Sequence, residues 1–428
     1  MTLLSVPGKV FAQVLLQRLE PLLTEKRRPQ QSGFTAGRST ADAILALRLL
    51  SDIHREFNRP LYVAYVDLKS AFDSVDREAL WKTVRGLGVP TLLLDLIKDL
   101  YTGTNSRVRL GSNLSPSFET KSGVRQGCVL APALFCRAMD WVLDCAMSRS
   151  GITLSGDNFA DADYADDIAA VEDDPASIAK TLENIESASS KLGLHISWAK
   201  TKVQNIGAGQ AIQNLAVEGQ SVEGVEKFIY LGSSLNSADG SRSEQLRRIG
   251  IASGIMNSLE RIWSQPHLSL HTKLRMYMSL VLPVLLYASE TWTVNKSDLG
   301  HLQAFHMRCQ RRILGVRWFH KIKNTEIFRR TSLPHIGNIL QLRQHSLFGH
   351  VVRMKQQAPA HMALELCRDM TLTRRIPPGW KRPRGRPRMT WVSQLRNDWG
   401  IPVSTAWTRA SDRLLWRRDA MALQGYAI

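Results

Sequence analysis

Two adjacent carboxylates, Asp166 and Asp167, lie between short runs of strand-forming residues in the segment Phe159–Val171. Such a pattern predicts a tight β-hairpin that carries both carboxylates at its tip. Like charges this close repel each other, so partial burial would raise the pKa of one of them unless a cation neutralised the pair. Mg²⁺ prefers oxygen ligands and would fill that role. An acidic surface turn fits the same residues, so the hairpin alone leaves both interpretations open.

A second acidic position follows a predicted strand earlier in the chain. Residues 61–67 are apolar nearly throughout and end on Asp67, which is typical of a buried strand. A helix is expected to follow, with Asp73 or Ser74 as its N-terminal cap. A strand-end carboxylate that faces a hairpin with two more is the ligand set of a two-metal phosphoryl-transfer site, whose ions lie roughly 3.5–4 Å apart. Many nucleic-acid enzymes need such a set, so the spacing does not identify the reaction.

Local patterns predict several further elements. Apolar residues repeat at helical spacing in Val10–Leu23 and in Thr40–Phe57. In the first segment the expected apolar side consists of Val10, Val14, Leu15, Leu19 and Leu22. Asp174 and Pro175 should start another helix, because an acidic cap followed by proline is typical of a helix N-terminus. A strand is predicted over Leu194–Trp198. Together these elements indicate an α+β region with a small antiparallel sheet.

Five segments, in order, carry a family resemblance. They are Asp67-Leu-Lys-Ser-Ala-Phe-Asp73, Ser122–Phe135, Tyr164-Ala-Asp-Asp167, Ala199-Lys-Thr-Lys202 and Tyr230-Leu-Gly-Ser-Ser234. These segments resemble the palm motifs of reverse transcriptases, most closely those of non-LTR (LINE-type) retrotransposons. Three more segments resemble that group specifically, namely Leu3–Lys9, Gln31–Thr40 and Tyr287–Trp292. The resemblance extends over most of the chain.

The resemblance implies an α+β right-hand polymerase fold with fingers, palm and thumb and a small antiparallel palm sheet, followed by a mostly helical C-terminal region. Fingers and palm would occupy residues 1–235, a helical thumb-like region 236–320, and a basic, tryptophan-rich region 321–428. The implied activity is RNA-directed DNA polymerisation, in which a primer 3′-hydroxyl is extended with dNTPs. The implied cofactors are two Mg²⁺ ions, with Mn²⁺ as a substitute, and the implied partners are an RNA template and a DNA primer.

The resemblance also assigns roles to the acidic residues and to one aromatic residue. Asp67 and Asp166 would bridge the two metal ions, and Asp167 would be a weaker or outer ligand. Phe72 would lie under the sugar of the incoming nucleotide, where its ring would crowd a 2′-hydroxyl and favour deoxynucleotides. A core phenylalanine at the start of a helix fits the same position.

Four other residues are implied at the nucleotide. Gln126 would contact the nucleotide or template, and Gly127 would let the backbone approach it, although an ordinary turn glycine fits there too. Lys200 would lie near the leaving pyrophosphate, unless it is simply a solvated loop lysine. Arg38 would contact the triphosphate.

The sequence departs from the family pattern near its start. Relatives usually continue upstream of Leu3–Lys9, with more of the fingers and an endonuclease domain, so we expect this chain to be N-terminally truncated and to lack that domain. Where relatives often have Leu-Asn, it has Ile196-Ser197. Two other functions therefore stay open. One is a catalytically inactive retroelement fragment that only binds nucleic acid, and the other is a group II intron-type maturase.

The composition is strongly basic. Lysine plus arginine number 56 against 38 acidic residues, which gives a formal net charge of +18. Such a chain is expected to bind polyanions, here template and primer, although high charge also serves solubility. The five cysteines are scattered and odd in number, which favours reduced thiols and an intracellular location, nuclear or cytoplasmic. No membrane partner is expected, because the longest apolar run is short and interrupted by Pro283.

Residues 374–388 form a basic, proline-rich segment that cannot be a regular helix. Arg384 and Arg386 resemble the core of an AT-hook, whose arginines enter the minor groove of duplex DNA. A nuclear-import signal or a solvated linker fits equally well. The tryptophans in this part of the chain have apolar neighbours and are expected to be core residues of a small module rather than base-stacking platforms. They are Trp380, Trp391, Trp399, Trp407 and Trp416.

Overall fold

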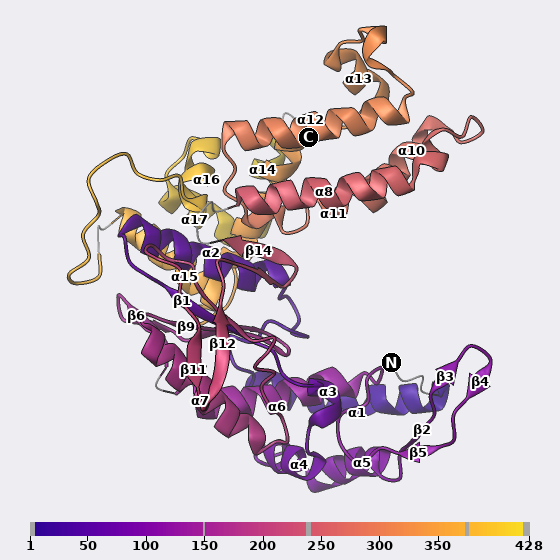
Figure 1. Cartoon of the computed structure of the whole chain (residues 1–428), viewed down its shortest axis with the longest axis vertical. Helices are drawn as coiled ribbons and strands as arrows, with labels where there is room; N and C mark the ends of the chain where they lie inside the picture. Colours follow the sequence, from indigo (N-terminus) through magenta and orange to yellow (C-terminus); the bar gives the residue numbers. More distant parts are fainter. Residues whose placement is uncertain (1–4, 149, 237–240, 373–375, 423–428) are drawn as a thin grey trace. The chain divides into compact units, whose positions relative to one another are not determined.

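The chain forms two compact units in a computed structural model that describes residues 5–148, 150–236, 241–372 and 376–422 (Figure 1). Unit 1 comprises residues 1–43, 60–225 and 357–359, and unit 2 comprises residues 44–59, 226–356 and 360–428. Parts of two predicted segments, Leu3–Leu4 and Arg374–Arg375, lie outside the described residues. No helix in the described ranges is long and apolar enough to cross a membrane.

Unit 1 is built on a six-stranded sheet with the strand order β11-β12-β10-β1-β9-β8. Its strands are β1 (Tyr62–Val66), β8 (Asp161–Tyr164), β9 (Asp167–Glu172), β10 (Lys202–Asn205), β11 (Leu215–Val217) and β12 (Gln220–Gly224). The pairing is antiparallel except between β10 and β12. Shorter two-stranded ladders join β2 (Asn105–Ser106) to β5 (Phe118–Glu119), β3 (Arg109–Leu110) to β4 (Asn113–Leu114), and β6 (Ile152–Leu154) to β7 (Asp157–Phe159).

The central strand β1 is buried because both of its neighbours and the covering helices exclude water. Val63 and Ala64 are fully buried, as the apolar run in the sequence predicts. Val66 pairs with Ile168 of β9, so the next residue, Asp67, lies beside Asp167 at the same edge of the sheet. The register of two strands therefore brings the two predicted acidic positions together.

Helices of unit 1 share one hydrophobic core with this sheet. They are α1 (Val6–Glu25), α3 (Ala71–Ser74), α4 (Arg77–Arg85), α5 (Thr91–Tyr101), α6 (Leu130–Ala146) and α7 (Pro175–Ser190). Helix α7 begins where it is predicted, with the Asp174 side chain accepting hydrogen bonds from the backbone of Ala176 and Ser177. In Figure 1, α7 lies against the sheet that contains β1 and β9.

Unit 2 is mostly helical. It contains the hairpin β13 (Lys227–Tyr230) and β14 (Ser233–Asn236), and most of α2 (Thr40–Glu56), a helix predicted from its apolar spacing. The remaining elements, with η for short π- or 3₁₀-helices, are α8 (Arg242–Ser258), α9 (Glu260–Trp263), α10 (Leu270–Met276), η1 (Tyr277–Val281), α11 (Leu282–Leu285), η2 (Ser289–Thr291), α12 (Lys296–Ile313), η3 (Trp318–His320), α13 (Asn324–Thr331), α14 (Ile336–Val352), α15 (Pro359–Leu372), α16 (Trp391–Trp399), α17 (Val403–Ser411) and α18 (Arg413–Ala422).

The C-terminal tryptophans have the structural role predicted for them. Trp391, Trp399 and Trp416 are buried around the ring of Phe348 on α14. Trp380 packs its ring against His54 and Phe57 at the end of α2. Trp391, Trp399 and Trp416 are therefore core residues of unit 2, whereas Trp380 is half-buried.

Three local predictions are wrong. A short helix, α3, follows β1, and the longer helix α4 is capped by Asp76, whose carboxylate accepts from the backbone of Ala79, and not by Asp73 or Ser74. Only one isolated bridge forms within Leu194–Trp198, and the strand comes later as β10. On α1, Leu15 and Leu19 are buried as predicted, but Val10 and Val14 are exposed, and Ala12 and Leu23 complete the buried stripe. In all three cases long-range packing overrides the local pattern.

Candidate active site

The two adjacent carboxylates lie on a tight hairpin, as predicted. Tyr164 at the end of β8 pairs with Asp167 at the start of β9, so the turn consists of Ala165 and Asp166. Ala165 has φ 59°, in the left-handed region that residues with a β-carbon seldom adopt. The turn therefore needs contacts from elsewhere to hold it.

The side chain of Gln31 supplies those contacts. Its Oε1 accepts hydrogen bonds from the backbone nitrogens of Gly33 and Ala165, both at 2.8 Å, and its Nε2 donates to the carbonyl of Ala165 at 3.4 Å. Gln31 is almost fully buried, so these bonds are shielded from water. The amide thus fixes the backbone one residue before Asp166.

Gly33 explains how the two segments come this close. A β-carbon at Gly33 would lie 2.2 Å from the backbone nitrogen of Ala165, so no larger residue fits without displacing the turn. The backbone nitrogen of Ser32 also donates to the carbonyl of Asp163, at 2.9 Å. These contacts tie residues 31–33 directly to the hairpin.

The three predicted ligands influence one another electrostatically. Burial, together with the charges of Asp166 and Asp67, raises the pKa of Asp167 to about 6. Burial also raises the pKa of Asp166, as does the charge of Asp67. The carboxylates are therefore close enough to repel one another, which favours a neutralising cation or proton.

Asp67 is held by the segment that carries Lys200. The carbonyl of Asp67 accepts from the backbone of Ser197 at 2.7 Å, and the backbone nitrogen of Asp67 lies 3.3 Å from the hydroxyl of Thr201. Lys200 Nζ lies 3.3 Å from Asp67 Oδ2 and forms an ion pair with it. The contact between the two side chains is an ion pair and not a hydrogen bond. Asp67 Oδ2 is buried without a hydrogen-bond partner. This oxygen therefore faces the Lys200 ammonium, and a metal ion bound there would replace or share that contact.

Phe72 stacks on a core aromatic ring. Its ring lies 4.3 Å from that of Phe135, at an interplanar angle of 14°, and Phe72 itself is half-buried. The backbone nitrogens of Gly123 and Val124 donate to the carbonyls of Val75 and Phe72, at 2.8 and 2.7 Å. The structure thus brings the predicted Phe72 segment and the start of the Gln126 loop side by side.

Glycine is required at position 123 of this loop, because the loop backbone approaches the backbone of Asp73 closely there. Gly123 has φ +75°, and a β-carbon there would lie 2.6 Å from the carbonyl oxygen of Asp73. Gln126 and Gly127 follow on the exposed side of the loop, and Gly127 has φ 103°.

Arg38 is half-buried before α2, where burial lowers the pKa of its guanidinium and Asp42 opposes that shift. The roles of Arg38, Gln126 and Gly127 at a nucleotide stay predictions.

A buried ion-pair network underlies the hairpin and was missed in the sequence. Arg28 Nη1 lies 2.6 Å from Asp161 Oδ2 and 2.8 Å from Asp163 Oδ2. Both carboxylates are buried, and burial raises the pKa of Asp163 well above its usual value, with Asp161 adding to the shift and Arg28 opposing it. Acidic residues at alternate positions of a strand signal such a network, because they point to one face.

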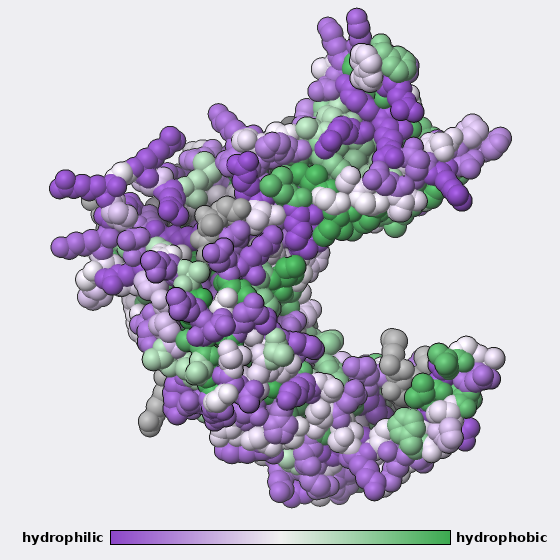
Figure 2. Space-filling model, in the orientation of Figure 1, coloured by the Kyte–Doolittle hydropathy of each residue, from purple (hydrophilic) through white to green (hydrophobic). Residues whose placement is uncertain are grey.

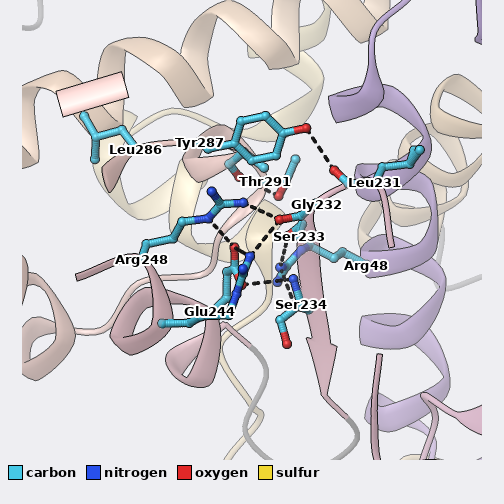
Figure 3. Close-up of polar contacts among 12 residues, drawn as sticks. Arg48, Leu231, Gly232, Ser233, Ser234, Glu244, Arg248, Leu286, Tyr287 and Thr291 are labelled. Carbon is cyan, nitrogen blue, oxygen red and sulfur yellow. Dashed lines mark hydrogen bonds and ion pairs between the residues drawn. The ribbon is translucent and has the colours of Figure 1, made fainter. Parts of the chain in front are cut away.

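In unit 2, a second network holds the hairpin of the Tyr230–Ser234 motif (Figure 3). Tyr287 donates its hydroxyl to the carbonyl of Leu231 at 2.9 Å, and the Arg248 guanidinium lies over the Tyr287 ring, 4.4 Å from its centre, while it donates to the carbonyl of Gly232. The buried Glu244 accepts from Arg248 at 2.7 Å and from the backbone of Ser234 at 3.0 Å.

Helix α2 completes this second network. The Arg48 guanidinium donates to the hydroxyl of Ser233 at 3.2 Å and to the carbonyl of Ser234 at 3.3 Å (Figure 3). Each backbone carbonyl of residues 231, 232 and 234 thus accepts from a side chain. The motifs at 230–234 and 287–292 are therefore linked by direct contact.

The sequence pattern of the family described as reverse transcriptase (RNA-dependent DNA polymerase) matches residues 1–235 of this 428-residue chain. The chain belongs to the reverse transcriptase family. The α+β polymerase fold predicted for it is thereby confirmed, and the motif segments of this reverse transcriptase lie in both units.

Relatives of this reverse transcriptase come from mobile elements. It is 26% identical over 280 residues to a transposon-derived protein of Caenorhabditis elegans, covering 61% of this chain and 95% of the relative. It is 28% identical over 239 residues to the Retrovirus-related Pol polyprotein from the type-2 retrotransposable element R2DM of Drosophila melanogaster. This match covers 54% of this chain and 21% of the relative. It is 23% identical over 359 residues to the RNA-directed DNA polymerase from the mobile element jockey of Drosophila funebris, covering 79% and 37%. These relatives confirm a LINE-type reverse transcriptase.

The chain spans less than two-fifths of the R2DM and jockey proteins. Among solved structures, a telomerase from Candida tropicalis in complex with a fragment of telomeric RNA is similar, with a TM-score of 0.40 and 15% identity, covering 83% of this chain and 56% of that one. The apo telomerase of the same species, truncated from its C-terminal domain, gives a TM-score of 0.39 with 17% identity, covering 54% and 44%.

Proposed function

We propose that this chain is an RNA-directed DNA polymerase that extends a primer 3′-hydroxyl with dNTPs by two-metal phosphoryl transfer. The observation that supports this most is the placement of Asp67 beside the Asp166–Asp167 turn, where the three carboxylates repel one another. A surface turn of acidic residues would gain nothing from the buried Gln31 amide that holds it. Phosphoryl transfer needs charge neutralisation and positioning more than covalent chemistry, and this arrangement offers both.

The donor set fits Mg²⁺ in its chemistry. Carboxylate oxygens suit hard cations, and Asp67 Oδ2 is buried without a hydrogen-bond partner. Within the described ranges, no group of three or more acidic, histidine or cysteine side chains is already arranged around one metal position. Mg²⁺ is usually bound through one or two carboxylates together with substrate phosphates, so a site completed by the nucleotide agrees with this geometry.

Asp67 and Asp166 would hold the two ions and Asp167 would be an outer ligand. When bound, the ions would lower the pKa of the primer hydroxyl and neutralise charge on the phosphates. Lys200, on the turn before β10, would hold a positive charge near the leaving pyrophosphate and give it a proton. Its ion pair with Asp67 places its ammonium at the edge of the carboxylate group.

The remaining predicted residues would shape the nucleotide pocket. Phe72, fixed by its stacking on Phe135, would exclude a 2′-hydroxyl. Gln126 and Gly127 would contact the nucleotide or template, and Arg38 the triphosphate. We also propose residues 1–235 as fingers and palm, 236–320 as a thumb, and 321–428 as a basic C-terminal region.

Nucleic acid would be the main partner, as RNA template and DNA primer. Arg384 and Arg386 are exposed and are proposed to contact duplex DNA. The strong positive charge favours this, since each neutralised phosphate releases counterions. An intracellular location, in the nucleus or cytoplasm, follows from these partners.

Primer extension on poly(rA) with oligo(dT), dTTP and Mg²⁺ tests the proposal. The wild-type chain should incorporate dTTP and Asp166→Ala should not, while both bind the primer–template equally. Asp99→Ala is the matched control, because Asp99 is an exposed carboxylate on α5. A folded wild-type chain that binds primer–template without extending it would refute polymerisation and support the fragment that only binds nucleic acid.

A further inference from the structure

Trp318 differs from every other tryptophan of the chain. All eleven tryptophans lie within the described residues, and the other ten are buried or half-buried. Trp318 is 87% exposed, and the adjacent Phe319 is 57% exposed. Two aromatic rings exposed to water do not gain the free energy of apolar burial that stabilises buried tryptophans. The two rings meet edge to face, with centres 5.9 Å apart.

The loop that carries these rings is held in place by the helices on both sides. Arg311 of α12 donates to the carbonyl of Ile322 at 2.9 Å and to the side-chain oxygen of Asn324 at 2.8 Å. Val316 is buried in a small cluster with Met307 and Ile327. The apolar residues that can pack locally therefore do so, and the exposure of Trp318 and Phe319 is not a consequence of a loose loop.

The surroundings of the rings are positively charged. Arg317, Lys321 and Lys323 are exposed, and residues 314–325 contain no acidic residue. The nearest one along the chain, Glu326, is bound by Arg329 and Arg330 at 2.7 Å each. Figure 2 shows this end of unit 2, around α13, as mostly hydrophilic surface with a small pale-to-green patch.

We propose that Trp318 and Phe319 form a stacking platform for single-stranded nucleic acid. Unpaired bases would stack on the two rings, and the phosphates would contact Arg317, Lys321 and Lys323. Exposed aromatic rings within a basic surface are the chemistry by which proteins hold single strands without sequence preference. Duplexes, whose bases are already stacked, would not use the rings. The platform goes beyond the polymerase activity and does not depend on it.

Two replacements at Trp318 test the platform in the full chain. Trp318→Phe keeps a ring, whereas Trp318→Leu keeps an apolar side chain without one. Binding of fluorescent oligo(dT) and of a blunt duplex is measured by anisotropy, with thermal unfolding as a check on folding. Trp318→Leu should bind oligo(dT) about 5- to 100-fold more weakly, with little change for Trp318→Phe and for the duplex.

Other binding sites on the chain could mask this loss, so a second measurement maps the contact. Oligo(dT) containing photoreactive thiothymidine is crosslinked to the wild-type chain and digested with trypsin. The proposal requires crosslinks in the peptide Trp318–Lys321, which lies between two cleavage sites. Bound oligonucleotide without crosslinks in this peptide would overturn it.

Three further outcomes also overturn it. Equal losses for single strand and duplex would mean that the loop acts only through its charge. Equal binding by the Phe and Leu variants, together with no crosslinks in the peptide Trp318–Lys321, would show that ring stacking does not contribute. Binding of the wild-type loop to anionic vesicles, lost in Trp318→Ala, with oligo(dT) binding unchanged, would mean that the rings insert into lipid instead.

Discussion

The side-chain oxygen of Gln31 lies 2.8 Å from the backbone nitrogen of Ala165, a residue 134 positions later in the chain. Ala165 has a positive φ, so the turn that presents Asp166 is intrinsically unfavourable and persists because other contacts hold it. Gln31 is thus a positioning residue for the hairpin in the proposed mechanism. It bonds to the backbone of the turn and leaves the carboxylates themselves to a metal.

Gln31→Ala is expected to lower kcat for primer extension on the order of tenfold to a hundredfold, because small displacements of catalytic groups cost that much. KM for dTTP and affinity for primer–template should change little. Gln30→Ala, at the half-buried neighbour of the same type, is the control and should behave as wild type. If Gln31→Ala kept the wild-type kcat, Gly33 and the strand pairing would be sufficient to hold the turn without the Gln31 amide.

Arg28→Met should destabilise unit 1 by about 3–5 kcal/mol, because it leaves Asp161 and Asp163 buried without their cation. Urea unfolding at neutral pH measures this free energy. Lys26→Met, two residues away and exposed, removes the same charge without a buried partner and should cost less than about 1 kcal/mol. Similar losses for both variants would contradict a structural role for the network.

Stability should depend on pH through Asp140 of α6. Burial raises the pKa of Asp140 to about 7, even though the charge of Arg27, whose Nε lies 3.3 Å away, opposes the shift. A carboxyl group with a higher pKa in the folded than in the unfolded chain binds its proton more tightly when folded. Its contribution to stability is therefore present below about pH 4 and is lost as the pH rises to about 7.

Asp140→Asn removes this pH-dependent loss of stability, because the asparagine side chain does not titrate. Relative to wild type, the variant should become more stable as the pH rises from about 4 to about 7, by at least about 1 kcal/mol. Thermal or urea unfolding across this range measures the difference, with Asp99→Asn as the exposed control. A difference that stays constant with pH would mean that Asp140 is charged throughout because of Arg27.

Gly123→Ala and Gly88→Ala form a matched pair, since the two glycines have φ +75° and +79°. Nothing lies within 4 Å of a β-carbon at Gly88, whereas one at Gly123 would meet the backbone of Asp73. Gly88→Ala should cost about 1 kcal/mol from backbone strain alone. Gly123→Ala should cost about 1–3 kcal/mol more and raise KM for dTTP, because it displaces the Phe72 segment. Equal costs would show that the loop adjusts freely.

Phe72→Val should weaken the preference for dNTPs over rNTPs by on the order of tenfold to a hundredfold, if the ring excludes the 2′-hydroxyl. The ratio of kcat/KM values for dTTP and UTP on poly(rA) measures this preference. Phe118→Val, at an exposed phenylalanine on β5, should leave it unchanged. A loss of stability without a change in the ratio would mean that Phe72 serves only to pack on Phe135.

Local patterns in the sequence predicted much of this arrangement. The apolar run ending on Asp67, the hairpin around Asp166 and the start of α7 at Asp174 each depend on neighbouring residues, so periodicity and capping were sufficient to find them. The cap at Asp76 and the exposure of Val10 and Val14 on α1 were mispredicted, because several residues satisfied the local rule. Which of them was used depended on packing against distant elements.

The sequence by itself determined the family, the order of its motifs and the carboxylates proposed to act, because these reside in short contiguous segments. Only the tertiary structure showed that Gln31 and Arg28 support the hairpin, since each reaches it across more than 130 residues. It also decided which tryptophans are buried. Trp318 and Trp391 are the same residue type within helical regions, and only the packing around each one separates an exposed ring from a core ring.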